Sequence, residues 1–173
     1  KANPKDPEAD YLSGVVNQRW MKPEIALGYY TAASEKEPGE LAYILAKAEM
    51  MVALGHQEEA LHLLQDKVTF FENSATIRDA VGQLLVQFKK YNEAADMLRQ
   101  ASILATDDHT IGEHLALALY FAHRYPEAIE TLTRLTAQDG YLKRADLFLA
   151  LGKSQLEIGR MRDARASLEK SAQ

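Results

Sequence analysis

The side chains that could do chemistry in this chain of 173 residues are its histidines and the carboxylates near them. His56 and His62 are six residues apart, and His109 and His114 are five apart. Two metal ligands on one face of a helix need a spacing of three or four residues, so neither pair predicts a metal site. The chain has no cysteine, which excludes disulfides and thiolate ligands. We therefore expect no metal and no cofactor.

Acid-base or nucleophilic catalysis has equally little support in the sequence. Asp107, Asp108 and His109 are adjacent, but they precede a predicted helix, where aspartates commonly cap the free N–H groups. The glycines are scattered rather than clustered in a phosphate-binding loop, and the sequence singles out no serine with a histidine and a third orienting group. The hypothesis that the protein is an enzyme that uses Asp108 or His109 therefore has no positive support in the sequence. We expect a protein without catalytic activity.

Composition bounds the class of protein. With 47% hydrophobic residues and a net charge of −5, the chain can bury a core and lacks the basic surface that nucleic acid requires. No stretch approaches the roughly 20 apolar residues that span a bilayer, so we expect a soluble protein with no membrane insertion. A cysteine-free chain folds in reducing and oxidising spaces alike, which leaves both cytoplasm and periplasm open. Because it opens on Lys1 and not on methionine, we expect either a processed product or a piece of a longer protein, and we favour the piece.

Small residues recur along the chain in two series with a step of 34 residues, and only the last step is 36. Such series are typical of an array of repeated units, because two helices approach closely only where the side chains at their crossing are short. Gly140 lies where the two extra residues are best accommodated. One series is Ala26, Ala60, Ala94, Ala128 and Ala164, and the other is Gly14, Ala48, Gly82, Ala116 and Gly152.

The residues around these positions predict a helical hairpin in each unit. In the second unit, apolar side chains recur at helical spacing from Leu41 to Val52, stop at Gly55, and resume on a helix that begins near Gln57. The first helix of the first unit has a weaker pattern. The hairpin is nevertheless the common element from which the array is built.

Several residues have the types and spacing of helix caps. Asp6 precedes a proline at the first helical position, which suits the start of a helix. Thr76 with Asp79, and Thr110 with Glu113, have the spacing of capping boxes. These pairs predict helix starts in the third and fourth units.

The turn between the two helices carries a recurring motif, and on this motif, the period of 34 and the small residues the chain resembles tetratricopeptide-repeat (TPR) proteins. The family's turn reads Gly-x-Tyr-x-Glu-Ala, and the resemblance covers roughly residues 8–171. Arg78, Gly112 and Lys47 depart from the family's preference for bulky apolar residues. The matching segments are Gly55-His-Gln-Glu-Glu-Ala60, Lys89-Lys-Tyr91-Asn-Glu93-Ala94, His123-Arg-Tyr125-Pro-Glu127-Ala128 and Gly159-Arg-Met161-Arg-Asp163-Ala164.

The resemblance implies an all-α fold, a right-handed superhelix of about five antiparallel helical hairpins. Residues 1–7 are expected to form an N-terminal extension and residues 8–173 a single array. Stacked hairpins of this kind have one concave and one convex face. The expected units are residues 8–37, 38–72, 73–107, 108–141 and 142–173.

The resemblance also implies a non-catalytic scaffold that binds a peptide or helix of a partner protein in the concave groove. One subclass holds acidic C-termini with a Lys, Asn and Arg clamp, and we reject it because the matching positions carry other residues. The groove is expected to be apolar with acidic spots, so a partner with apolar side chains and a Lys or Arg would fit. Tyr120 and Phe121 are the expected anchors. The alternative is that these and about half of the other apolar groove residues belong to the core of a tightly wound superhelix. The expected groove residues are Leu45, Glu49, Val52, Asp79, Gln83, Val86, Glu113, His114, Leu117, Tyr120, Phe121, Leu149 and Lys153.

An alternative function is assembly or oligomerisation, as an excised segment of a longer repeat protein. Repeat arrays need a polar terminal helix to cover their last apolar face. Met161, Ala164 and Leu168 would be left partly open at the C-terminal end of this chain. This alternative expects self-association through that uncapped end.

Overall fold

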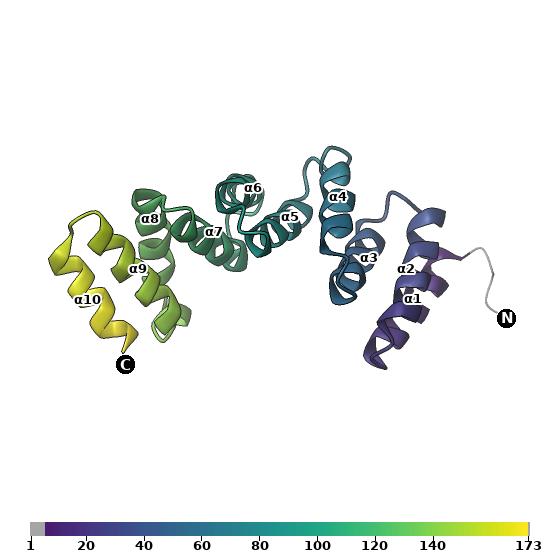
Figure 1. Cartoon of the computed structure of the whole chain (residues 1–173), viewed down its shortest axis with the longest axis horizontal. Helices are drawn as coiled ribbons and strands as arrows, with labels where there is room; N and C mark the ends of the chain where they lie inside the picture. Colours follow the sequence, from purple (N-terminus) through teal and green to yellow (C-terminus); the bar gives the residue numbers. More distant parts are fainter. Residues whose placement is uncertain (1–5, 173) are drawn as a thin grey trace. The chain divides into compact units, whose positions relative to one another are not determined.

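The computed structural model describes residues 6–172, and this part of the chain contains ten α-helices, one short 3₁₀ helix and no strand (Figure 1). The helices follow one another with short connections, and consecutive helices pack together within each of two compact units. The prediction of an all-α chain built from helical hairpins is confirmed. None of these helices is long and apolar enough to cross a membrane.

The first compact unit ends at Glu72 and holds two hairpins. Its helices are α1 (Pro7–Arg19), α2 (Pro23–Lys36), α3 (Leu41–Ala53) and α4 (Gln57–Val68).

The second compact unit begins at Asn73 and holds three hairpins. The first helices of these hairpins contact one another, α5 against α7 and α7 against α9, so together they form one continuous face. The helices are α5 (Ala75–Gln87), α6 (Tyr91–Leu104), α7 (His109–Phe121), α8 (Tyr125–Thr136), α9 (Ala145–Glu157) and α10 (Met161–Ser171), with the 3₁₀ helix η1 (Asp139–Tyr141) between α8 and α9.

The small residues lie where the two helices of a hairpin cross, as predicted. A Cβ atom on Gly14 would lie 2.5 Å from the ring of Tyr30. A Cβ atom on Gly82 would lie 2.5 Å from the side chain of Leu98, and one on Gly152 would lie 2.6 Å from the side chain of Leu168. Each leucine follows its glycine by sixteen residues. The alanine series is fully buried, each member with 0% exposure: Ala26, Ala60, Ala94, Ala128 and Ala164.

The first helix of each hairpin is followed, two positions after its last residue, by a residue in the left-handed backbone region. Gly55 has φ +87°, and hydrogen bonds run from Gly55 N to Val52 O and from His56 N to Met51 O. These bonds satisfy carbonyls that the end of α3 would otherwise leave free. The motif's glycine position is therefore a helix terminator. The equivalent residues are Met21, Lys89, His123 and Gly159, all with positive φ.

Some predicted caps are confirmed and two are wrong. Asp6 accepts a hydrogen bond from Glu8 N, and Asp108 accepts from the next turn of α7, as expected of the Asp107–Asp108 pair. The predicted capping boxes at Thr76 and Thr110 do not form, because α5 and α7 begin earlier and are capped by Ser74 and Asp108. The carboxylates expected in those boxes bind side chains on other elements instead.

The C-terminal end is less open than expected. Met161 is 64% exposed, but Leu168 is only partly exposed and Ala164 is fully buried. Ala164 is covered because Gly152 lets α10 approach α9, with the Ala164 carbonyl 3.2 Å from the position of a Cβ at residue 152. The expectation that Ala164 is left open is wrong. Gly140 lies in η1, where the two extra residues were placed.

Replacing two glycines of the first hairpin by alanine should change stability in opposite directions. Gly14→Ala should lower the free energy of unfolding by about 1–3 kcal/mol, since its Cβ would overlap the buried ring of Tyr30. Gly28→Ala, inside α2 with nothing within 4 Å of the new Cβ, should raise it by about 0.5–1 kcal/mol. Urea unfolding followed by circular dichroism measures both. Equal effects would contradict the packing argument.

Candidate functional site

The thirteen predicted groove residues all lie on the first helices of hairpins. Three of them, Leu45, Glu49 and Val52, belong to α3 in the first unit. The other ten belong to α5, α7 and α9 in the second unit, and five of them line one cavity. The predicted residues of the second unit are Asp79, Gln83 and Val86 on α5, Glu113, His114, Leu117, Tyr120 and Phe121 on α7, and Leu149 and Lys153 on α9.

A cavity of about 200 Å³ opens between α5 and α7, and the buried Leu98 of α6 forms part of its lining. Contact between α5 and α7 brings its two walls together. Five of its seven lining residues were predicted from helical spacing; Leu98 and Gln87 were not. We call it the α5–α7 cavity. It is lined by Gln83, Val86, Gln87, Leu98, His114, Leu117 and Phe121.

The apolar part of this cavity ends in an aromatic cluster. Phe121 is 43% exposed and stacks on Tyr91 of α6, with 5.3 Å between ring centroids and 27° between planes. Tyr120 lies against Phe121 at 5.2 Å but does not line the cavity. The two predicted anchors therefore differ. Phe121 lines the cavity, whereas Tyr120 contacts the ring of Phe121 without lining the cavity.

The polar edge of the cavity is a chain of hydrogen bonds between α5 and α7. The Asp79 carboxylate binds His114 Nδ1 at 2.7 Å and accepts a hydrogen bond from Gln83 Nε2 at 2.7 Å. Asp79 raises the pKa of His114 above 6.5, chiefly through this hydrogen bond, while burial acts in the opposite direction. Protonated His114 and ionised Asp79 thus form a charge pair at the edge of an apolar hollow.

The second acidic position of this face is also paired. Arg144, in the connection before α9, places its Nη2 atom 2.7 Å from the Glu113 carboxylate and 3.0 Å from Asp146. These partners raise the pKa of Arg144 and lower that of Asp146. Sequence reasoning expected Glu113 as an acidic spot of the groove. It missed Arg144 because 31 residues separate the pair, and no local pattern signals it.

The predicted residues of α9 and α3 do not join this cavity. Leu149 is 40% exposed and Lys153 is exposed, and neither lines the α5–α7 cavity. In the first unit, Leu45 and Val52 are half-buried, and Glu49 is exposed and accepts a hydrogen bond from Gln18 Nε2 at 2.9 Å. Leu45, Glu49 and Val52 belong to the first compact unit, whereas the α5–α7 cavity is lined by residues of the second.

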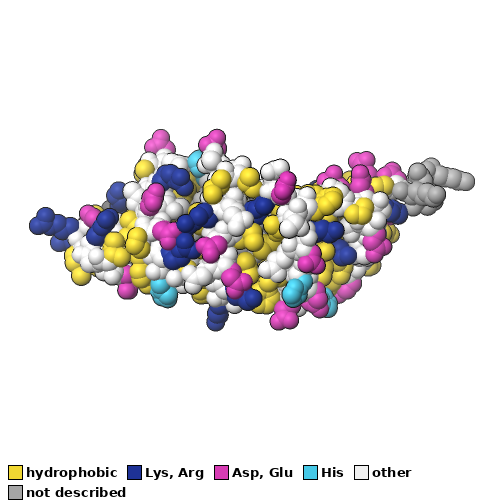
Figure 2. All heavy atoms as spheres, turned by 90° about the horizontal axis from the view of Figure 1, so that it is seen from above, with side chains coloured by type: hydrophobic (Ala, Val, Ile, Leu, Met, Phe, Trp, Pro, Cys, Tyr) yellow, Lys and Arg dark blue, Asp and Glu magenta, His cyan; other side chains and the backbone are white. Residues whose placement is uncertain are grey.

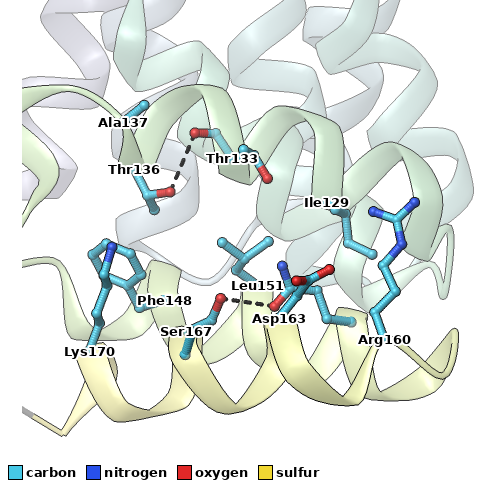
Figure 3. A pocket seen from close by; sticks show the side chains of 12 residues that line it. Ile129, Thr133, Thr136, Ala137, Phe148, Leu151, Arg160, Asp163, Ser167 and Lys170 are labelled. Atoms are coloured by element: carbon cyan, nitrogen blue, oxygen red, sulfur yellow. Dashed lines mark hydrogen bonds between the residues drawn. The ribbon is translucent and has the colours of Figure 1, made fainter.

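A larger hollow of about 440 Å³ lies among α8, α9 and α10, away from the predicted residues (Figure 3). Ser167 Oγ donates a hydrogen bond to Gln155 Oε1 at 2.8 Å, and Lys170 lies over the ring of Phe148 at 5.3 Å. Among the described residues, no buried side-chain nitrogen or oxygen lacks a hydrogen-bond partner. The buried side chains Ser167 and Gln155 of this hollow thus bind each other, and we regard it as a weaker candidate than the α5–α7 cavity.

The side chains whose types suggest catalysis or metal binding make other contacts in this structure. Asp108 caps α7, and His109 packs edge-on against Tyr141. His56 lies 3.5 Å from Glu59 one helical turn away. Within residues 6–172 no group of three or more His, Asp or Glu side chains has the arrangement of a metal site.

Comparison with solved structures gives the fold of TPR proteins. YrrB, described as a TPR protein, matches with a TM-score of 0.82 and 19% identity over 98% of this chain and 86% of that chain. MamA from Desulfovibrio magneticus RS-1, residues 41 to the end, matches with a TM-score of 0.84 and 17% identity over 99% and 96% of the two chains. At these identities the likeness establishes the fold. Sequence comparison finds no matching family model and no matching curated protein.

The pKa of His114 should depend on Asp79. Asp79→Asn should lower this pKa, because the amide removes the charge that favours the imidazolium while burial remains. NMR titration of His114 measures it, and Gln83→Ala, which removes the other partner of Asp79, is the control that should leave it raised.

The raised pKa of His114 also has a consequence for stability. Because it lies above the unfolded value near 6.5, the stability that His114 contributes is complete below pH 6.5 and is lost as pH rises through the folded pKa. His114→Gln should therefore cost most stability at acidic pH. A cost that grew toward alkaline pH would contradict the assignment.

Proposed function

We propose that this chain is a non-catalytic module that binds a segment of a partner protein on the α5, α7 and α9 face, with one apolar side chain of the partner in the α5–α7 cavity. The observation that carries the proposal is the cavity itself. It joins half-buried apolar residues of two neighbouring helices to a partly exposed aromatic ring. Exposed aromatic rings beside apolar pockets are typical anchors of protein interfaces.

The size of the cavity favours a side chain over a free small molecule. Small-molecule sites usually have volumes of roughly 300–1,000 Å³. The α5–α7 cavity, at about 200 Å³, is smaller and open on one side, so it suits a single Leu, Met or Phe projecting from a longer segment. The amides of Gln83 and Gln87 at its edge are exposed and can form hydrogen bonds with the backbone of that segment.

Charge contributes less to this recognition than the sequence alone suggested. Asp79 is paired with His114, and Glu113 with Arg144. A Lys or Arg of the partner would have to displace these internal partners, which costs the ion pairs already made. We therefore place the recognition in the apolar contact and assign a basic residue of the partner a secondary role.

The fold comparison agrees with a binding role. YrrB is described as a TPR protein with an unusual peptide-binding site. That site belongs to YrrB. The shared helical-hairpin fold supports the proposal that the present chain binds a peptide segment.

A second role, in assembly, is favoured by a different observation. The first hairpin exposes several large apolar side chains on α1 and α2. These residues lie in the first compact unit and have no part in the α5–α7 cavity, so the two roles are compatible.

Removing the aromatic wall of the cavity should weaken binding of selected peptides. We expect 12-residue peptides selected on the intact protein from a random display library to share a Leu, Met or Phe. Phe121→Ala should weaken their binding about tenfold or more, because about 1.4 kcal/mol of interaction free energy corresponds to a factor of ten. Tyr120→Ala should have a smaller effect, since Tyr120 does not line the cavity.

The matched control is Ile103→Ala, which removes an apolar side chain that is 68% exposed on α6 and outside the cavity. It should leave peptide affinity unchanged. Fluorescence anisotropy gives the affinities and circular dichroism the helix content. Peptides that bind Phe121→Ala and the parent protein equally well would overturn the proposal.

A further inference from the structure

The first hairpin carries an exposed apolar surface that the proposed peptide site does not use. Leu12 and Val16 of α1 and Trp20, the residue that follows α1, recur every four residues and are 53%, 42% and 64% exposed. Ile25 and Tyr29 of α2 are 49% and 38% exposed. Leu12, Val16 and Tyr29 line one shallow hollow of about 270 Å³, so the two helices contribute to one surface. We call these five residues the α1 face.

The repeat shows that Val16, in the α1 face, occupies a position that is buried in other hairpins. One repeat after Val16 stands Met50, and further repeats bring Ala118 and Ser154. These three are 4%, 0% and 0% exposed, against 42% for Val16. Met50 is buried because it packs on Ala26 and Tyr30 of α2. A neighbouring helix covers the position that is equivalent to Val16 in the second hairpin, where Met50 packs on α2. Among the described residues, no helix covers Val16 in this way.

The charges at the two ends of α1 indicate which helix fits. Glu8 lies in the same four-residue row as Leu12 and Val16, one turn before Leu12. Arg19 lies in the last turn, three residues after Val16. Within residues 6–172 neither side chain has an ion-pair partner. An antiparallel copy of α1, related by a two-fold axis near residue 14, would bring each Glu8 beside Arg19 of the other copy.

The exposed area is large enough for such a contact. If a fully exposed large side chain offers roughly 150–250 Å², the exposed parts of the α1 face together with Met21, 86% exposed in the adjoining turn, amount to about 650 Å². Two copies would bury about 1,300 Å², which lies within the range of specific protein interfaces. Two-fold dimers are also the commonest form of self-association, since one self-complementary surface suffices.

The opposite end of the chain has a different character. Arg165 of α10 stands one repeat after Ile129 and two after Ala95, which are 6% and 0% exposed. Its side chain is 83% exposed, and Lys and Arg side chains are prominent near α10 in Figure 2. Burying this guanidinium against an apolar surface would be costly. The charged surface of α10 thus does not favour self-association through this helix. The apolar surface on α1 is better suited to it.

We propose that the α1 face is covered by a second copy of this chain, in a two-fold dimer with the two α1 helices antiparallel. Val16 lies near the centre of the contact, and two Glu8–Arg19 pairs close its ends. This interface lies in the first compact unit and is independent of the α5–α7 cavity, so dimer formation and peptide binding can be tested separately.

Sedimentation equilibrium of the intact protein tests the proposal. The parent protein should show a concentration-dependent rise from the monomer mass of 19.4 kDa to twice that value. Val16→Glu should shift the dimer dissociation constant upward by at least tenfold, because it buries a carboxylate from each copy in the apolar contact, close to the two-fold axis. Met161→Glu, at a 64% exposed apolar side chain of α10, should leave the dissociation constant unchanged. A parent protein that stays monomeric at all concentrations, or a dimer that survives Val16→Glu, overturns the proposal.

A charge exchange tests the antiparallel geometry and the identity of the partner. Glu8→Lys and Arg19→Glu should each weaken the dimer, since each creates two like-charge contacts. The double variant Glu8→Lys/Arg19→Glu should restore it, because the pairs reform with reversed signs. Thermal melts monitor the helix content of all variants. Two singly weakened variants whose combination is weaker still would contradict the antiparallel arrangement, and so would binding of the α1 face to another protein in place of self-association.

Discussion

The close crossing of the two helices in each hairpin is the contact on which the remaining structure depends. Gly14 meets Tyr30, Gly82 meets Leu98 and Gly152 meets Leu168, always sixteen residues apart. A short residue opposite a bulky one lets the two helices of these three hairpins come close together. In the second unit, α5 lies beside α7. Leu98 packs against Gly82 at the crossing of α5 and α6, and it also lines the α5–α7 cavity. The close packing within this hairpin therefore contributes one wall residue of the site.

The fold could be predicted from the sequence because its main signals are periodic. The spacing of Ala60 from Ala94 and the apolar stripe from Leu41 to Val52 both persist whatever the tertiary environment, and α3 and α4 have the predicted extents. The helix caps were harder, because the pattern of a threonine followed by an acid three residues later is short and occurs inside helices as well. In this protein Asp79 lies within α5 and binds His114, a partner 35 residues away that the local pattern does not reveal.

The candidate site was predictable where helical spacing decides it and unpredictable where contacts between helices decide it. Gln83, Val86, His114, Leu117 and Phe121 follow from projecting one face of each first helix, and they line the cavity together. Leu98 belongs to a second helix, and Arg144 belongs to the connection that contains the two extra residues; neither position has a local signal. The interior of α3 was harder to predict, because Met50 is buried and the adjacent Met51 is half-buried. Both faces of this helix are apolar, because it packs on α2 as well as on α4.

The hairpins of the second unit are held together differently on their two sides, and this difference bears on the site. The second helices α6 and α8 are linked by charge: Arg99 and Arg124 both bind Glu127, and Arg124 also binds Asp96 at 2.6 Å. These two guanidinium groups lower the pKa of Glu127 to about 2. The residues are partly exposed, so salt screens their attraction and each pair contributes little stability. The first helices α5 and α7 are joined by the Asp79–His114 pair and also by apolar side chains, whose burial is insensitive to screening. Conditions that weaken the outer ion pairs therefore leave the walls of the α5–α7 cavity in contact, which is the behaviour a preformed binding surface requires.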